Sequence, residues 1–257
     1  EKKNKIKVKR ISGCSIGVCM GIAYLLDKLD LIYIMVFNLY TFIRKNQNLY
    51  KLQFYIKNFI ENELSEEDIT ILNNIFYISY FNISKKKQIV LNKYRNKNHL
   101  IKTIIKSTFV PYLINGNMTD SENCIDGIYP YLFNNRIINR KILFINLTGL
   151  DKIKNLIYIK NETNIYPRII NGILDIHMFF MTGQNTSMCS YVDEWHFGHY
   201  LLFRSRQYIF SFIVYLLFLC KKFDNYVPPY LKKNKFTLNY INFIRNLWND
   251  LIITVTI

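Results

Sequence analysis

The sequence has few of the residues that mark disordered, fibrous or disulfide-built chains. Of its 257 residues only 9 are glycine and 5 are proline, whereas 50% are hydrophobic, which excludes a collagen-like, linker-like or disordered chain. Its 5 cysteines are an odd number without a close pair, which argues against a disulfide framework or a zinc ribbon. We therefore expect reduced thiols in an intracellular protein of one large domain or two small ones.

No apolar run reaches the length of a typical membrane span. The longest, residues 208–220, has about 13 positions between basic residues, whereas a span needs roughly 20. We predict a buried or interfacial helix there, and a short transmembrane segment with flanking basic residues stays an alternative. We expect no signal peptide in these residues, because the first ten are mostly charged.

Acidic residues are scarce. The 18 aspartates and glutamates stand against 34 lysines and arginines, which gives a formal net charge of +16. A charge of this size attracts polyanions, either nucleic acid or an anionic lipid surface, although an AT-rich coding sequence would account for part of the lysine excess. The basic residues are scattered and no RNA-binding motif accompanies them, so a basic RNA-binding protein is the weaker alternative.

Strand and helix patterns alternate over the first 180 residues, which predicts an α/β fold. Ser65 and Asp68 have the spacing of a capping box, and Asn98 is expected to cap the helix that follows it. The apolar run 142–147 predicts a buried strand. The other expected strands are 7–12, 75–83 and 88–93, and the expected helices are 18–29, 31–60, 99–107 and 168–181.

Gly13, Ser15 and Gly17 form a G-x-S-x-G pattern between a predicted strand and a predicted apolar helix. In this context the pattern is typical of a nucleophile elbow, in which small flanking residues let the backbone turn tightly and project the serine hydroxyl. The positive end of the following helix would face the developing oxyanion. The alternative is an ordinary strand–helix turn with small residues for close packing.

A nucleophilic serine needs a base, and the four histidines give little support for one. His99 begins a lysine-rich helix and is expected to be solvated, whereas His177 lies on an aromatic helix and is expected to pack in a core. His196 and His199 have the H-x-x-H spacing of half a metal site. No third ligand follows at suitable spacing, so no metal is expected.

An aspartate can serve as the base instead, and at this point the chain resembles the patatin-like phospholipase family. The resemblance is close over residues 7–150 and loose over 151–193. It implies a three-layer α/β sheet with helices on both faces in a domain spanning 1–193, followed by an apolar and basic helical tail, 194–257. The pieces that carry it, in order, are the elbow 11–17, the strand 76–84, the helix 98–107 with its stop at Pro111, Cys124-Ile125-Asp126-Gly127 as the D-G-[GA] motif, and the strand 141–147.

The resemblance implies a serine lipid acyl hydrolase of the phospholipase A type. Ser15 would attack the ester, and Asp126 would accept its proton and return it to the leaving alcohol through an acyl-enzyme intermediate. Gly127 would complete the motif, the Ile16 amide would contact the oxyanion, and no cofactor is implied. The expected partners are a phospholipid or another acyl-ester lipid and an anionic membrane surface, bound peripherally, with no nucleic acid.

Two departures from the family pattern support an alternative function. The family's glycine-rich oxyanion loop has no counterpart in the 14 residues before Ser15, so the first strand and loop of the domain are expected to be missing. Ile128 stands where the family has a small residue, and its side chain could crowd the dyad. The alternative is a catalytically inactive, membrane-associated scaffold. In the tail, residues 238–253 are amphipathic, which suits core packing or a membrane interface.

Overall fold

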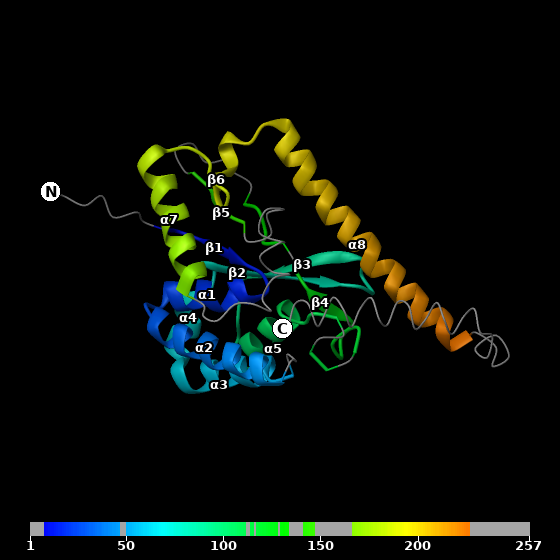
Figure 1. Ribbon diagram of the computed structural model, residues 1–257. Coiled ribbons are helices and arrows are strands. Elements are labelled where there is room, and N and C mark those ends of the chain that lie inside the picture. The colour runs from blue at the N-terminus through cyan, green and yellow to red at the C-terminus, as the bar shows by residue number, and fades with distance from the viewer. Residues whose placement is uncertain are drawn as a thin grey trace. The chain divides into compact units, whose positions relative to one another are not determined.

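The computed structural model describes residues 8–46, 50–111, 114–115, 117–127, 129–133, 141–146 and 166–226. These residues form both helices and strands, so the predicted α/β class is confirmed (Figure 1). The chain divides into two compact units, Glu1–Leu132 and Phe133–Ile257. The domain boundary expected after residue 193 rests on the family resemblance and stays a prediction.

The described part of the first unit contains a four-stranded sheet and five helices. The first strand leads through four helices to the second, and a tight hairpin then leads to the third strand, the fifth helix and a short fourth strand (Figure 1). In chain order the elements are β1 (Ile11–Gly13), α1 (Ile16–Leu25), α2 (Leu29–Asn46), α3 (Leu52–Glu63), α4 (Glu66–Leu72), β2 (Phe76–Asn82), β3 (Lys87–Leu91), α5 (Lys97–Ser107) and β4 (Cys124–Asp126).

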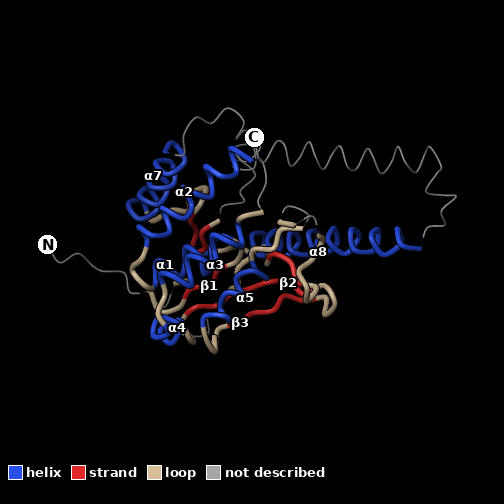
Figure 2. Tube along the Cα trace, turned by 90° about the horizontal axis from the view of Figure 1, so that it is seen from below, coloured by secondary structure: helices blue, strands red, loops and turns tan. Residues whose placement is uncertain are grey.

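β2 is the central strand of this sheet (Figure 2). β1 runs parallel to it, with Gly13 opposite Ile78, and β3 runs antiparallel along its other edge. β4 is also antiparallel to β2 and places Asp126 opposite Tyr80. Because β3 fills one edge of β2, β1 and β4 share the other edge, where their carboxyl ends approach each other.

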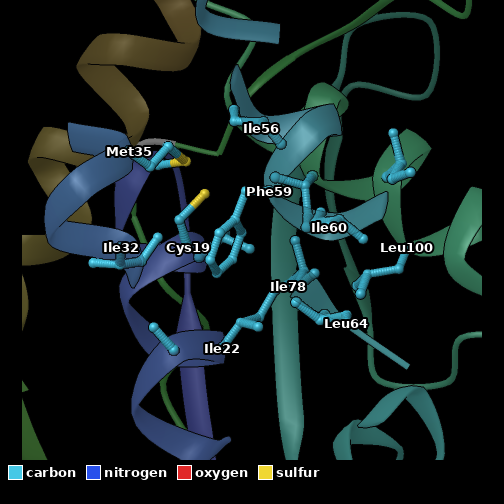
Figure 3. Packing of buried hydrophobic residues seen from close by; sticks show 14 of the residues in the cluster. Cys19, Ile22, Ile32, Met35, Ile56, Phe59, Ile60, Leu64, Ile78 and Leu100 are labelled. Atoms are coloured by element: carbon cyan, nitrogen blue, oxygen red, sulfur yellow. The ribbon is translucent and has the colours of Figure 1, made fainter. Parts of the chain in front are cut away.

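One hydrophobic core joins helices α1–α5 to β2 (Figure 3). Phe76 and Ile78 enter it from the strand, and neither is exposed to solvent. Gly21 lets α1 lie close to the sheet, since a side chain there would collide with the Phe76 ring. The fully buried helical side chains include Ile22, Ile56, Ile60, Leu72, Leu100 and Ile104. Burying an aliphatic side chain of this size stabilises the fold by about 1.5–3 kcal/mol. A second helical layer, as in the expected three-layer arrangement, stays a prediction.

The capping box at the start of α4 is confirmed. The Ser65 hydroxyl accepts a hydrogen bond from the Asp68 amide, and the Asp68 carboxylate accepts one from the Ser65 amide. The predicted hairpin is also confirmed, because β2 and β3 pair around a turn at residues 83–86. Local hydrogen-bonding patterns of this kind depend on a few neighbouring residues, so they can be predicted from the sequence alone.

Several elements differ in extent from the prediction. The first strand covers only Ile11–Gly13, and the helical stretch 31–60 is two helices, α2 and α3. The cap of α5 is Asn96 rather than Asn98, because the Asn96 side chain accepts the His99 amide. Asn98 lies instead in the first turn of the helix. An asparagine at either position fits the sequence pattern, so the pattern did not distinguish them.

The described part of the second unit contains a two-stranded sheet and two long helices. The strands pair antiparallel, and the first long helix packs against the second strand. The rings of Phe144 and Trp195 meet edge to face, with centroids 5.1 Å apart. The elements are β5 (Leu143–Ile145), α7 (Tyr166–Thr182), β6 (Cys189–Tyr191), the 3₁₀ turn η2 (Val192–Glu194) and α8 (Phe197–Tyr226).

Two predictions about this unit are wrong. The strand expected to be buried at 142–147 is partly exposed over its described residues 142–146, with Leu143 at 38% and Ile145 at 50%, because β5 has only β6 as a described partner strand. His177, expected in a core, lies on the exposed side of α7, whose buried residue is Phe179. The predicted helix 168–181 is confirmed, since it lies within α7.

Residues 208–220 are helical and lie within α8. Among the side chains described in this stretch, Tyr208 and Phe212 are 74% and 60% exposed, and an interfacial role stays a prediction. Over the described residues, none of the helices combines the length and the apolar character that crossing a bilayer requires. The amphipathic segment 238–253 lies outside the described residues.

Candidate functional site

Ser15 occupies the sharp turn between β1 and α1. Its backbone has φ 52° and ψ −139°, a combination that residues with side chains rarely adopt and that costs on the order of 1–3 kcal/mol. Ser15 is only half-buried, so solvent and small molecules can reach it. A half-exposed serine in a strained strand-to-helix turn is the geometry of a nucleophile elbow.

The two glycines of the motif differ in what they do. A Cβ atom at Gly13 would lie 3.0 Å from the carbonyl oxygen of Gly17 and 3.0 Å from the Cα of Val18. The first turn of α1 therefore passes too close to β1 for a side chain at Gly13. At Gly17 a Cβ atom would meet nothing within 4 Å. The close packing expected at both flanks of the serine is thus required at only one of them.

Asp126 and the elbow meet at the middle of β2. Gly13 pairs with Ile78 and Asp126 pairs with Tyr80, so the ends of β1 and β4 are about 7 Å apart along the shared strand. The two residues proposed from the sequence as nucleophile and base lie 111 positions apart in the chain (126 − 15). The fold brings their strands end to end.

The Asp126 side chain is buried, and its charge reaches the elbow. Asp126 is only 7% exposed. Burial, together with the charge of Asp126, raises the pKa of the Cys14 thiol, the residue before Ser15. A carboxylate that is shielded from water and near the turn has the placement that a general base needs. Cys14 stays protonated at neutral pH and does not compete as a nucleophile.

Gly127 packs directly against the central strand. A Cβ atom there would collide with the carbonyl oxygen of Ser79, so this position requires glycine because of close backbone approach. The chain then returns to β1, where the Tyr131 amide donates a hydrogen bond to the Ser12 hydroxyl at 2.7 Å. Ile128, the residue expected to crowd the dyad, lies outside the described residues.

Sequence reasoning missed two buried serines behind the elbow. Ser79 in β2 and Ser107 at the end of α5 are both 0% exposed. The Ser107 hydroxyl donates to the Ser79 carbonyl at 2.7 Å and accepts the Ser15 amide at 3.1 Å. The signal that could have revealed Ser79 is its place in the middle of an aromatic and β-branched strand, where a polar side chain needs a partner.

The same segment also holds the aspartate. The Phe109 carbonyl, two residues beyond Ser107, accepts the Asp126 amide at 2.9 Å. The Ser79 hydroxyl donates to the Tyr129 carbonyl at 2.9 Å, in the segment that follows Asp126. Ser79, Ser107 and the Phe109 carbonyl therefore fix the backbones of Ser15 and Asp126 in one hydrogen-bonded frame.

The first turn of α1 supplies candidate oxyanion donors. The Ile16 and Gly17 amides have no hydrogen-bond partner within the described part of the chain, as is usual at the start of a helix. They also carry the positive end of the helix dipole. The Ile16 amide, proposed from the sequence for this role, thus has a free N–H directly after Ser15.

Three of the four histidines contact residues that are close to them in the sequence. His99 is partly buried rather than fully solvated, and its Nδ1 atom accepts the Arg95 amide at 3.3 Å. The rings of His196 and His199 have centroids 6.1 Å apart at the start of α8. No group of three or more histidine, cysteine, aspartate or glutamate side chains suited to a metal occurs among the residues that the structure describes.

In comparisons with known proteins, no family model matches the chain, and neither the curated proteins nor the solved structures provide a match. The patatin-like resemblance therefore rests on the sequence motifs alone and stays a prediction.

Proposed function

We propose that the chain is a patatin-like serine acyl hydrolase with Ser15 as nucleophile and Asp126 as general base. The observation that carries the proposal is the meeting of a strained serine turn and a buried aspartate on one strand, β2. The shared frame of Ser79, Ser107 and the Phe109 carbonyl supports it, because a chemical dyad needs both partners held in fixed geometry.

The proposed reaction is ester hydrolysis through an acyl-enzyme. The Ser15 hydroxyl attacks the carbonyl carbon while Asp126 accepts the hydroxyl proton, and the oxyanion accepts a hydrogen bond from the Ile16 amide. The intermediate then expels the alcohol, which takes the proton from Asp126 and leaves the acyl group on Ser15. Water attacks this ester while Asp126 accepts a proton from it, the bond between the acyl group and Ser15 breaks, and Asp126 returns the proton to the Ser15 oxygen as the carboxylic acid leaves.

The proposal extends to the finer features of the family. These are a three-layer domain over residues 1–193, a helical tail over 194–257, and a phospholipid or another acyl-ester lipid as substrate. Action at an anionic membrane surface is supported by the net charge of +16 and by the exposed apolar side chains of α8, such as Ile209 and Phe212. Basic residues beside exposed apolar ones favour binding at a lipid interface.

A fluorophosphonate probe tests the nucleophile. We expect the full-length chain to be labelled, with the adduct located at Ser15 by mass spectrometry and absent in Ser15→Ala. Asp126→Asn should slow labelling by about 10²–10⁴-fold, because proton removal from the serine is lost. Ser84→Ala, at an exposed serine in the hairpin turn, is the matched control and should label like the parent. Labelling that persists in Ser15→Ala would contradict the proposal.

The same experiment distinguishes the alternative function. A folded chain that takes no label and hydrolyses no ester would favour the inactive, membrane-associated scaffold, which Ile128 in the third position of the D-G motif supports. Retention of RNA with a salt-sensitive affinity would instead favour the basic RNA-binding protein.

A further inference from the structure

We propose that Ser107 is a positioning residue that holds the Ser15 backbone in its reactive turn. The geometric part of this proposal stands on the hydrogen bonds of the first unit, and its catalytic consequence rests on the proposed function. Ser107 ends α5, is fully buried and lies 92 positions from Ser15 in the chain. Ser107 accepts a hydrogen bond from the backbone amide of Ser15 and touches no reacting atom.

The hydroxyl of Ser107 behaves unlike the neighbouring hydroxyls of α5. A buried serine or threonine in a helix commonly donates to a carbonyl one turn earlier. Thr103 does so to His99 at 2.8 Å, and Thr108 does so to Ile104 at 3.0 Å. The Ser107 hydroxyl instead donates across to the Ser79 carbonyl at 2.7 Å and accepts the Ser15 amide at 3.1 Å. The Ser107 hydroxyl therefore joins the end of α5 to β2 and to the turn at Ser15.

This bridge holds the strained turn at the amide nitrogen of Ser15. The Ser15 amide is held from one side by both the hydroxyl and the carbonyl of Ser107, each at 3.1 Å. A residue at φ 52° keeps that conformation only where its surroundings determine it. Without the hydroxyl, the turn can relax and the Ser15 side chain moves relative to Asp126. Misplacement of a reacting group by about 1 Å costs on the order of 10²-fold in rate.

The first test compares Ser107→Ala with Thr108→Val in the full-length chain. Both changes remove one fully buried hydroxyl from adjacent positions, and only the first hydroxyl contacts Ser15. With a fluorophosphonate ester, we expect the limiting rate of Ser15 modification to fall about 10–100-fold in Ser107→Ala, while the half-saturating probe concentration stays within about twofold. Thr108→Val should keep both values. If Ser107→Ala does not fold, Ser107→Cys, which puts a somewhat larger and only weakly hydrogen-bonding thiol in the same place, should show the same loss.

The second test is independent of chemistry. Hydrogen–deuterium exchange should show faster exchange of the Ser15 amide in Ser107→Ala and unchanged exchange in Thr108→Val. Unchanged protection of the Ser15 amide in Ser107→Ala overturns the positioning role. An unchanged limiting rate in a folded, labelled variant overturns its catalytic consequence. If the parent chain takes no label, the proposed function fails, and the exchange result alone decides whether Ser107 holds the turn.

Discussion

At the scale of single residues, the site depends on glycines that lie in close contact with neighbouring backbone. Gly127 lies against the Ser79 carbonyl and Gly13 lies against the first turn of α1, whereas the Cβ position of Gly17 is open. The first contact joins the end of β4 to the middle of β2, and the second joins the end of β1 to α1. Close backbone packing therefore requires glycine at positions 13 and 127, whereas position 17 has room for a side chain.

We expect Gly127→Ala to destabilise the protein by about 1–3 kcal/mol, because a methyl group there must displace the backbone of β2. Gly17→Ala should leave stability unchanged or raise it by up to about 1 kcal/mol, since alanine is the better helix former and meets no neighbour. Urea unfolding of both variants measures the difference. Equal destabilisation by the two substitutions would show that Gly127 does not pack as described.

At the scale of elements, α4 shows how charge and capping combine. The Asp68 carboxylate accepts the Ser65 amide and forms an ion pair with Lys28 at 2.9 Å, and the Lys28 ammonium also donates to the Glu63 carbonyl. Burial by itself would raise the pKa of Asp68, but the hydrogen bonds from Lys28 and Ser65 outweigh it and lower the pKa overall. One carboxylate thus ties the start of α4 to the segment between α1 and α2.

This lowered pKa sets a pH dependence. Because the folded state holds the pKa of Asp68 below that of the unfolded chain, its contribution is complete above about pH 4 and is lost as the pH falls through the folded value. We expect Asp68→Asn to cost about 0.5–2 kcal/mol at pH 7 and to flatten the loss of stability in acid. Glu67→Gln, at an exposed position in the same turn, is the control. Parallel pH profiles for Asp68→Asn and the parent would contradict this assignment.

Elements whose signals are local could be predicted from the sequence, and tertiary bridges could not. The capping box of Ser65 and Asp68 and the hairpin follow from neighbouring residues, and the elbow follows from a short motif in its context. The Ser107 bridge joins residues 92 positions apart, so no local pattern encodes it. The cap of α5 was misplaced because either of two nearby asparagines fits the capping pattern. The exposure of β5 was missed because an apolar run does not show which other elements cover it.

At the scale of the whole molecule, the net charge of +16 is the dominant long-range property. Its field adds over many scattered lysines and does not depend on a single contact. Attraction to a dense anionic surface therefore depends strongly on screening, whereas apolar contacts such as those available to Ile209 and Phe212 do not.

We expect the protein to co-sediment with vesicles that contain phosphatidylserine and to bind far less to pure phosphatidylcholine vesicles. Raising the salt from about 0.05 M to about 0.5 M should release most of the bound protein, because the screening length falls to a few ångströms. A fraction that stays bound at high salt would report the apolar part of the interface. Equal binding to both kinds of vesicle, or to neither, would contradict the proposed membrane partner.

The backbone of Ser15 also bears on how such a protein would drift over generations. A turn at φ 52° is easier for glycine than for serine, so Ser15→Gly would relieve the local strain. In a chain that had lost its chemistry, selection for stability would favour that replacement and nothing would oppose it. Under the proposed function, the reactive hydroxyl is the reason that a serine occupies this strained turn.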